Sequence, residues 1–308
     1  MALDRLIKAV IRTGNPSVAG LDPKLEYIPD FITESAFREH GETLEGAAAA
    51  LFSFNRGLID ALCDIVPAVK PQAAYYELYG WPGMRALSET IAYAKSKGMY
   101  VITDGKRNDI GSTMEAYAAA HLGVTKVGSR EIPAFNGDAL TVNGYLGKDG
   151  ITPLLDICRS YEKGIFVLVK TSNPSSGDLQ DRMIDGLPVY RRMGELCEQW
   201  GTQLPGKYGY SAVGAVAGAT WPEQLSELRT ALPHTFFLVP GYGAQGGGAS
   251  DVKGAFDQNG IGAVINSSRA ILCAWKKEGC RPEDYAGAAR REALRMKADI
   301  TAALEGQD

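Results

Sequence analysis

Two aspartates and a lysine, Asp104, Lys106 and Asp109, stand in one short stretch of the chain and could transfer a proton. A lysine beside carboxylates in a pocket stays protonated, because each negative charge stabilises its ammonium form. Such a lysine is suited to donate a proton to a substrate. The same residues could equally form a surface salt-bridge cluster, since structural ion pairs also perturb charges. The spacing alone leaves both interpretations open.

The elements on either side of this stretch position its charged residues. Residues 99–102 are apolar and rich in β-formers, which indicates a buried strand, and the apolar residues from 114 to 121 have helical spacing. Residues two apart on a strand project to the same side, so we expect Asp104 and Lys106 to lie together. Asp109 is further along and need not face the same way.

Strand-like and helix-like segments alternate along the whole chain. Eight short apolar segments are candidate strands: residues 17–22, 68–72, 99–102, 139–143, 165–170, 212–216, 235–239 and 262–266. Continuous Val/Ile/Leu runs between helices are typical of parallel strands covered by helices. Eight such units predict an α/β fold, a (β/α)8 TIM barrel. We expect residues 1–308 to form a single domain with insertions at about 23–67 and 173–210. A doubly wound sheet is the alternative.

Polar residues follow several of the predicted strands. In a barrel, side chains at the carboxyl ends of the strands converge on one mouth, where active sites lie. The polar strand-end residues include Asp22, Lys70, Asp104, Lys106, Lys170, Thr171, Ser172, Asn173, Gln245, Ser268 and Arg269. Lysines and aspartates gathered in this way are costly to bury, which favours a functional site.

Glycines at positions 241, 243 and 246 match the G-x-G-x-x-G pattern of dinucleotide-binding proteins. That motif should follow the first strand and lead directly into a helix, whereas this one follows the seventh predicted strand. Backbone amides of residues 241–247, together with Arg269, are better suited to bind a phosphate. A flexible loop beside a surface arginine is the alternative.

The Lys170-Thr171-Ser172 run is similar to one in a family of class I aldolases, where the lysine forms a Schiff base. Such a lysine needs a depressed pKa, and the local sequence supplies no obvious apolar or cationic pocket. We therefore interpret Lys170 as an ordinary strand-end residue.

The composition argues against several classes of partner. The net charge of −4 and the pI near 5.6 give no indication of nucleic-acid binding. There is no long apolar run, and the first residues begin an amphipathic helix instead of a signal peptide. The cysteines are scattered, which is typical of reduced thiols in a cytoplasmic protein, and the histidines have no ligand-spaced partner that would indicate a metal.

Taken together, these residues resemble the orotidine 5′-phosphate decarboxylase family. The motif Asp104-x-Lys106-x-x-Asp109-Ile110-x-x-Thr113 is similar to the family signature. The segment from Pro240 to Gly247 resembles its phosphate loop, and Ser268-Arg269 its phosphate-binding strand end. The length of the chain and its residues 171–174 resemble the longer bacterial subfamily.

The resemblance implies decarboxylation of orotidine 5′-monophosphate to uridine 5′-monophosphate, the last step of pyrimidine synthesis, without metal or organic cofactor. The implied catalytic tetrad is Lys70, Asp104, Lys106 and Asp109, with Lys106 as the proton donor. Asp109, Ile110 and Thr113 would enter the neighbouring subunit's site, so a homodimer would share its two active sites.

The resemblance also implies roles in substrate binding. Asp22 and Lys70 would bind the ribose, Ser172 would contact the pyrimidine edge, and Gln245 would bridge phosphate and base. The implied phosphate-binding residues are Pro240, Gly241, Gly243, Ser268 and Arg269.

Two other functions stay open at this point. A Mg²⁺-dependent sugar-phosphate decarboxylase or aldolase of the same barrel type would need a further acidic ligand near Asp104, where Lys70 would instead repel the metal. A non-catalytic nucleotide-binding barrel would keep Arg269 and the glycine loop, but it would not need alternating charges.

Overall fold

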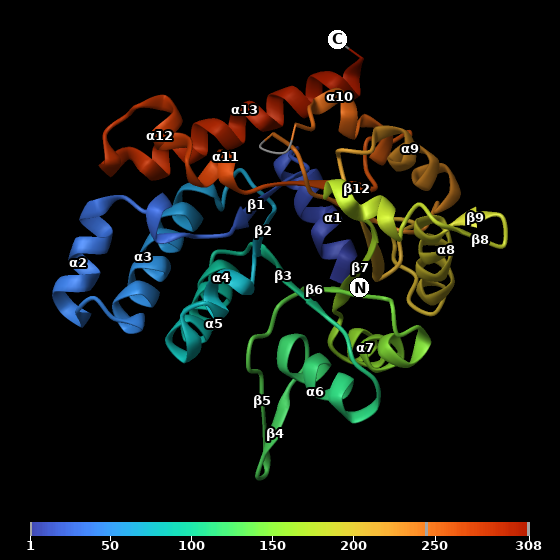
Figure 1. Cartoon of the computed structure of the whole chain (residues 1–308), viewed down its shortest axis with the longest axis horizontal. Helices are drawn as coiled ribbons and strands as arrows, with labels where there is room; N and C mark the ends of the chain where they lie inside the picture. Colours follow the sequence, from blue (N-terminus) through green and yellow to red (C-terminus); the bar gives the residue numbers. More distant parts are fainter. Residues whose placement is uncertain (1, 244–245, 307–308) are drawn as a thin grey trace.

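The computed structural model describes residues 2–243 and 246–306, and its centre is a closed barrel of eight parallel strands (Figure 1). The strands are β1 (Ser17–Leu21), β2 (Ala68–Pro71), β3 (Tyr100–Arg107), β6 (Ala139–Val142), β7 (Gly164–Lys170), β10 (Val213–Ala217), β11 (Phe237–Val239) and β12 (Ala263–Ser267). Each strand pairs with the next one along the chain, and β12 pairs with β1 to close the barrel. This confirms the predicted (β/α)8 barrel and excludes the doubly wound sheet.

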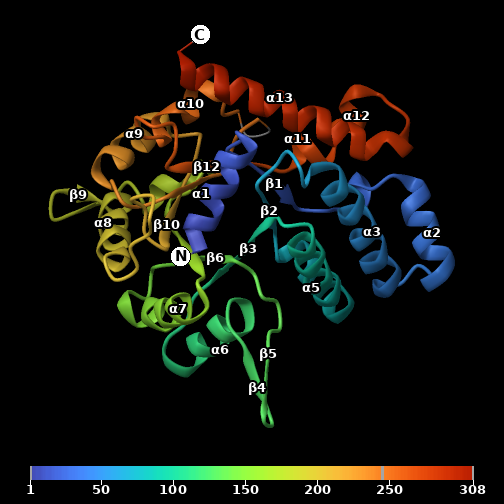
Figure 2. The same cartoon turned by 180° about the vertical axis from the view of Figure 1, so that it is seen from behind.

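Helices surround the barrel, as Figures 1 and 2 show from opposite sides. They are α1 (Ala2–Thr13), α2 (Asp30–His40), α3 (Leu44–Leu62), α4 (Ala74–Glu77), α5 (Gly80–Ser96), α6 (Gly111–His121), α7 (Lys148–Tyr161), α8 (Val189–Gly201), α9 (Pro222–Ala231), α10 (Ala249–Val252), α11 (Arg269–Leu272), α12 (Ala274–Glu278) and α13 (Tyr285–Glu305). The barrel strands are buried on both faces, because helices cover them outside and side chains fill the interior. None of the helices described between residues 2 and 306 is long and apolar enough to cross a membrane.

Helix α1 closes the end of the barrel at which the strands begin. Its apolar residues Leu3, Leu6 and Ile7 belong to the same buried cluster as the inward-facing Phe166 and Phe236. Both views show this helix near the middle of the molecule, next to the barrel (Figures 1 and 2). The opposite end of the barrel, where the strands finish, is therefore the end that can hold an open site.

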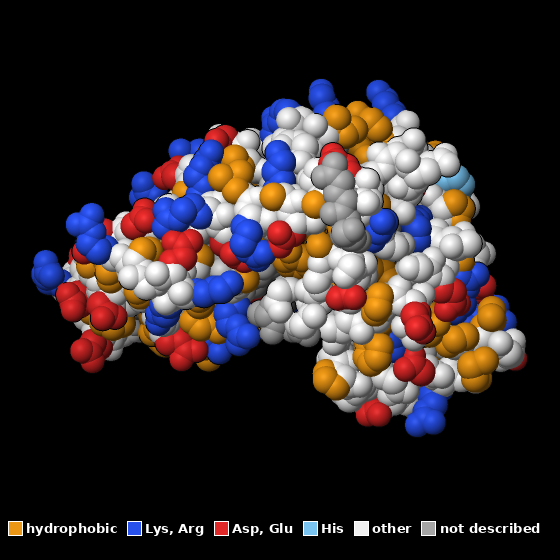
Figure 3. Space-filling view, turned by 90° about the horizontal axis from the view of Figure 1, so that it is seen from above, with side chains coloured by type: hydrophobic (Ala, Val, Ile, Leu, Met, Phe, Trp, Pro, Cys, Tyr) orange, Lys and Arg blue, Asp and Glu red, His pale blue; other side chains and the backbone are white. Residues whose placement is uncertain are grey.

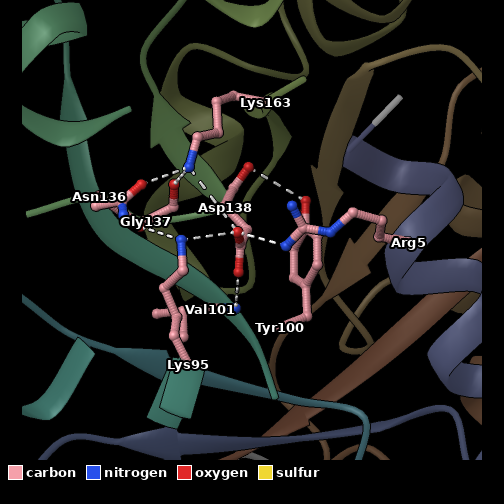
Figure 4. Close-up of polar contacts among 8 residues, drawn as sticks. All are labelled: Arg5, Lys95, Tyr100, Val101, Asn136, Gly137, Asp138 and Lys163. Atoms are coloured by element: carbon pink, nitrogen blue, oxygen red, sulfur yellow. Dashed lines mark hydrogen bonds and ion pairs between the residues drawn. The ribbon is translucent and has the colours of Figure 1, made fainter. Parts of the chain in front are cut away.

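A buried carboxylate fastens α1 to this closed end (Figure 4). Asp138 is fully buried just before β6, and its Oδ1 lies 2.6 Å from Nη2 of Arg5 and 3.2 Å from Nζ of Lys95. Its Oδ2 accepts a hydrogen bond of 3.0 Å from the backbone N–H of Val101. A third cation, Lys163, lies 3.9 Å from Asp138 Oδ1. One side chain thus joins α1, α5, β3 and the start of β7.

Lys163 contributes to the same network through neutral groups. Its ammonium donates to Oδ1 of Asn136 at 2.8 Å and to the carbonyl of Gly137 at 2.7 Å. Burial lowers the pKa of Lys163 to about 8, and the nearby Lys95 adds to this effect. The cluster therefore contains more positive than negative charge around Asp138, and the carboxylate is its central counter-charge.

Replacing Asp138 by asparagine is expected to lower the free energy of unfolding by about 3 kcal/mol, because Arg5, Lys95 and the mostly buried Lys163 lose their shared, fully buried counter-ion. Urea denaturation followed by circular dichroism measures this change. Asp156→Asn is the matched control, since Asp156 forms an exposed pair with Arg159 and should cost less than about 1 kcal/mol. Equal losses in the two variants would contradict the assigned role of Asp138.

Two short hairpins were not predicted from the sequence. One comprises β4 (Thr125–Val127) and β5 (Arg130–Ile132), and it projects from the barrel beside α6 (Figure 1). The other comprises β8 (Met183–Ile184) and β9 (Leu187–Pro188). Single 3-10 turns complete the structure: η1 (Leu25–Tyr27), η2 (Pro174–Asp178), η3 (Lys253–Ala255) and η4 (Pro282–Asp284).

Charges of both signs are mixed on one face of the molecule. Figure 3 shows Lys and Arg side chains among Asp and Glu side chains on the face seen from above. This mixture is typical of an exposed protein surface.

Candidate active site

A cavity of about 820 Å³ opens where the barrel strands end. Charged and polar side chains from several strand ends line it, as we expected from the parallel arrangement. Of the predicted site residues, the cavity brings together Asp22, Lys70, Asp104, Lys106, Ser172, Pro240, Gly241, Ser268 and Arg269.

Asp104 is the centre of the charged group in this cavity. Its Oδ2 lies 2.6 Å from Nζ of Lys70, and its Oδ1 lies 2.7 Å from Nζ of Lys106. Lys70 is in turn 3.9 Å from Oδ1 of Asp22. Carboxylates and ammonium groups therefore alternate in the order Asp22, Lys70, Asp104, Lys106. The alternative of a surface salt-bridge cluster does not describe Asp104, which is 6% exposed and lies between the two lysines.

Burial and charge together fix the ionisation of the two innermost residues. Burial alone would raise the pKa of Asp104, but the ammonium groups of Lys70 and Lys106 hold that pKa well below its usual range. Burial alone would lower the pKa of Lys70, whereas Asp104 and Asp22 hold it above its ordinary value. Asp104 is consequently anionic and Lys70 cationic around neutral pH.

Lys106 reaches Asp104 through an irregular backbone. Strand β3 continues to Arg107, further than the sequence indicated, and its pairing with β6 shifts register between Thr103 and Arg107. Within this shift, Lys106 has a φ of 48°, a left-handed conformation that is unfavourable for a residue with a side chain. Simple strand alternation therefore does not apply here, although the predicted proximity of Asp104 and Lys106 is confirmed. Backbone strain of this kind is concentrated at functional sites.

Two further residues that the sequence analysis did not single out hold Asp104 in place. The hydroxyl of Thr141 donates to Asp104 Oδ1 at 2.7 Å and accepts the backbone N–H of Lys106 at 3.0 Å. Nε2 of Gln72 donates to Asp104 Oδ2 at 3.0 Å. A polar residue between Leu140 and Val142 in an apolar strand was the available signal for Thr141.

The second part of the motif lies outside the cavity. Asp109, Ile110 and Thr113 do not line it, and Ile110 and Thr113 are exposed. The carboxylate of Asp109 accepts the backbone N–H of Ile110 at 2.8 Å. The Asp109 carboxylate therefore does not take part in the charged group around Lys106 of its own chain.

The glycine loop occupies the expected place after β11, the seventh barrel strand. Gly241, Gly243 and Gly246 all have positive φ, which explains the choice of glycine. The sequence analysis predicted that the backbone amides of this loop bind a phosphate. In the structure, Gly243 and Gly247 donate within the loop, to Gly247 O at 2.8 Å and to Gly241 O at 3.2 Å. Pro240 and Gly241 line the cavity, whereas Gly243 does not, and Gln245 lies outside the described residues.

Close approach of the backbone explains another glycine at the site. A Cβ on Gly20 of β1 would lie 1.9 Å from Oγ of Ser268. Glycine at this position allows the end of β1 to sit directly beside the Ser268-Arg269 segment, and it thereby places Asp22 and Arg269 around one cavity.

None of the histidines and cysteines in the described residues lines the cavity. His121 is buried in α6, where burial lowers its pKa to about 4, and its ring stacks on Phe135. Across residues 2–243 and 246–306, no three His, Cys, Asp or Glu side chains are grouped as metal ligands. The five cysteines are all unpaired.

The chain is similar to proteins of one family along most of its length. A model of the orotidine 5′-phosphate decarboxylase / HUMPS family matches residues 53–279. An orotidine 5′-phosphate decarboxylase from Rhodopirellula baltica is 48% identical over 274 residues, which cover 89% of this chain and 89% of that protein. An orotidine 5′-phosphate decarboxylase from Clostridium tetani is 39% identical over 308 residues and covers 100% of both chains.

Solved structures resemble this barrel as well. The structure of an orotidine-monophosphate-decarboxylase from Toxoplasma gondii superposes with a TM-score of 0.79 at 28% identity and covers 98% of each chain. The similarity therefore extends over nearly the whole chain.

Proposed function

The chain belongs to the orotidine 5′-phosphate decarboxylase / HUMPS family and decarboxylates orotidine 5′-monophosphate to uridine 5′-monophosphate, and we propose that Lys106 supplies the proton in this reaction. One observation supports the proposal above all others. The Lys106 ammonium group lies at the cavity, 2.7 Å from a buried carboxylate that a second lysine contacts from the other side.

The reaction itself explains why an ammonium group is needed. Loss of carbon dioxide leaves an electron pair on carbon 6 of the pyrimidine, and the Lys106 ammonium can stabilise this negative charge electrostatically. The same group then delivers a proton to carbon 6, so that the C–C bond is replaced by a C–H bond. The amine regains its proton from water after the product leaves.

Asp104 and Lys70 orient Lys106 in this proposal. Two ammonium groups and the Thr141 hydroxyl hold the Asp104 carboxylate, so its position is fixed before the substrate arrives. We place Asp104 near the departing carboxylate of the substrate, with Lys70 and Asp22 at the ribose hydroxyls.

The remaining cavity residues would bind the two ends of the nucleotide. We propose that Arg269 and Ser268 bind the phosphate with the glycine loop, including Gly243 and Gln245, and that Ser172 contacts the pyrimidine. The internal hydrogen bonds of the loop imply that its amides must reorient before they bind phosphate. Binding of the remote phosphate would then drive closure around the reacting base.

We propose that the enzyme is a homodimer in which Asp109, Ile110 and Thr113 complete the partner's site. Exposed apolar side chains gather near this part of the motif: Leu78 and Trp81 follow β2, Ile110 follows β3, and Tyr145 and Leu146 follow β6. These three strands are neighbours in the barrel, so the residues lie at one edge. Exposed apolar residues in one region are typical of a protein interface.

Two further proposals concern the whole chain. Residues 1–308 form a single barrel domain, and the insertions at about 23–67 and 173–210 contribute to the wall of its cavity through Lys24, Tyr27 and Gln180. The enzyme acts in the cytoplasm, where its cysteines stay reduced.

Turnover in the presence of a chelator tests the proposed chemistry against its Mg²⁺-dependent rival. We expect full activity when EDTA is present, because Lys70 lies 2.6 Å from Asp104 and leaves this carboxylate little capacity to bind a metal. The decrease in substrate absorbance and the formation of uridine 5′-monophosphate measure the rate. Activity that disappears with EDTA and returns with Mg²⁺ would support the rival, and binding without turnover would support a non-catalytic barrel.

A further inference from the structure

Lys170, the last residue of β7, is a buried cation that the reaction does not use. Its exposed fraction is 1%, and it does not line the cavity. Its Nζ lies 2.5 Å from Oδ1 of Asp181 and stands 4.6 Å from the ring centre of Trp221 and 5.5 Å from that of Tyr190. The aldolase-like Schiff-base role would require this amine to face the substrate, and the geometry does not allow that.

Asp181 belongs to a segment, residues 173–188, that we call the cavity cover. The cover contains η2 and the β8–β9 hairpin. The cover residues that line the cavity are Asn173, Ser175, Ser176, Asp178, Leu179 and Gln180. Asp181 directly follows this lining part of the cover, so its ion pair with Lys170 ties the cover to the barrel wall.

Neighbouring contacts connect this ion pair to the residue proposed to contact the pyrimidine. Gln180 accepts the backbone N–H of Thr171 at 2.9 Å and donates to its hydroxyl at 2.7 Å. Nε1 of Trp221 donates to Thr171 O at 2.9 Å, and the hydroxyl of Thr220 donates to Ser172 O at 3.1 Å. The backbone around Ser172 is thus held from the cover on one side and from the α9 side on the other.

We propose that Lys170 is a positioning residue whose ion pair with Asp181 holds the cavity cover in the arrangement that binds the substrate. This inference rests on the proposal that the cavity takes orotidine 5′-monophosphate, and it concerns affinity instead of the chemical step. Lys170 acts through Asp181 and touches no reacting atom.

The cavity cover is held against the barrel by charge and not by buried apolar side chains. Leu179, Met183 and Ile184 of the cover are exposed, so the cover has few buried apolar groups to hold it against the barrel. A buried ammonium group needs a counter-charge or water, and Asp181 supplies the counter-charge. The faces of Trp221 and Tyr190 add a cation–π attraction that keeps Lys170 in place. Without the carboxylate, Lys170 can be hydrated only if the cover moves away.

The test is a comparison of Asp181→Asn with Asp185→Asn. Asp181 has a side-chain exposed fraction of 46%, so its replacement should not prevent folding. We expect Asp181→Asn to raise KM about tenfold with kcat within about twofold, as when a mutation removes binding that the ground state and the transition state share. Asp185, at the exposed tip of the β8–β9 hairpin, provides a control with the same change of charge, and we expect its KM to stay within about twofold of wild type.

A double-mutant cycle with Lys170→Met identifies the pairing. In Lys170→Met, Asp181 has already lost its ion-pair partner. The double variant Lys170→Met/Asp181→Asn should therefore have the same KM as Lys170→Met. An unchanged KM in Asp181→Asn, an equal rise in Asp185→Asn, or additive effects in the cycle would each overturn the inference. If Lys170→Met does not fold, the two aspartate variants decide the question alone. Wild-type protein without turnover would instead refute the proposed function.

Discussion

Replacing Lys106 by alanine is expected to lower kcat for decarboxylation about 10⁴-fold or more. The substitution removes both the positive charge beside the developing carbanion and the proton that quenches it. Lys70, the other lysine at Asp104, already pairs with the second oxygen of that carboxylate at 2.6 Å. Single-turnover and steady-state assays of uridine 5′-monophosphate formation measure the loss.

The same variant should keep its fold and its affinity for the product nucleotide within about tenfold. Lys106 has a side-chain exposed fraction of 46%, so its removal leaves no large cavity, and the residues proposed to bind phosphate and ribose are unchanged. Isothermal titration with uridine 5′-monophosphate and thermal unfolding check this. Lys126→Ala, on the exposed strand β4, is the matched control. Near-normal turnover in Lys106→Ala would refute the proposed proton donor.

The barrel could be predicted from the sequence because its signal is local and repeated. Each strand that is buried on both faces must be apolar throughout, and each intervening helix must carry an apolar stripe. The convergence of Lys70, Asp104 and Lys106 followed from the same pattern, since parallel strands in a closed barrel end at one mouth. These predictions needed only the order of the strands and helices along the chain, and no knowledge of which distant residues are in contact.

The details of the site depend on contacts between residues far apart in the sequence. The register shift in β3 and the left-handed Lys106 are set by pairing with β6 and by Thr141, not by the local residues. Asp138 meets Arg5 across 133 positions of the chain, which local spacing cannot reveal. Lys170 gave a clear motif, but its burial against Asp181 and Trp221 depends on how the insertion folds back.

Asp109 differs from the other three members of the implied tetrad, because the cavity of its own chain does not contain it. If the partner subunit supplies this carboxylate, Asp109→Ala should lower kcat at least about 100-fold while each chain keeps its own Lys106–Asp104 pair. Steady-state assays at saturating substrate measure the loss. Sedimentation of the variant should still show a dimer, since the exposed apolar edge is unchanged.

Mixed dimers of Lys106→Ala and Asp109→Ala chains decide whether the site is shared. In such a dimer, the cavity of the Asp109→Ala chain keeps its own Lys106 and receives Asp109 from the partner, so one of two sites is complete. Co-expression with two different tags isolates this species, and its kcat should be about half that of the wild type because the twofold symmetry provides two equivalent sites.

Lys106→Ala paired with Asp104→Asn is the matched control. Both residues serve the cavity of their own chain, so each site keeps one defect and no activity should return. Recovery in neither pairing would mean that Asp109 serves the cavity of its own chain, and recovery in the first pairing alone requires two chains at each active site.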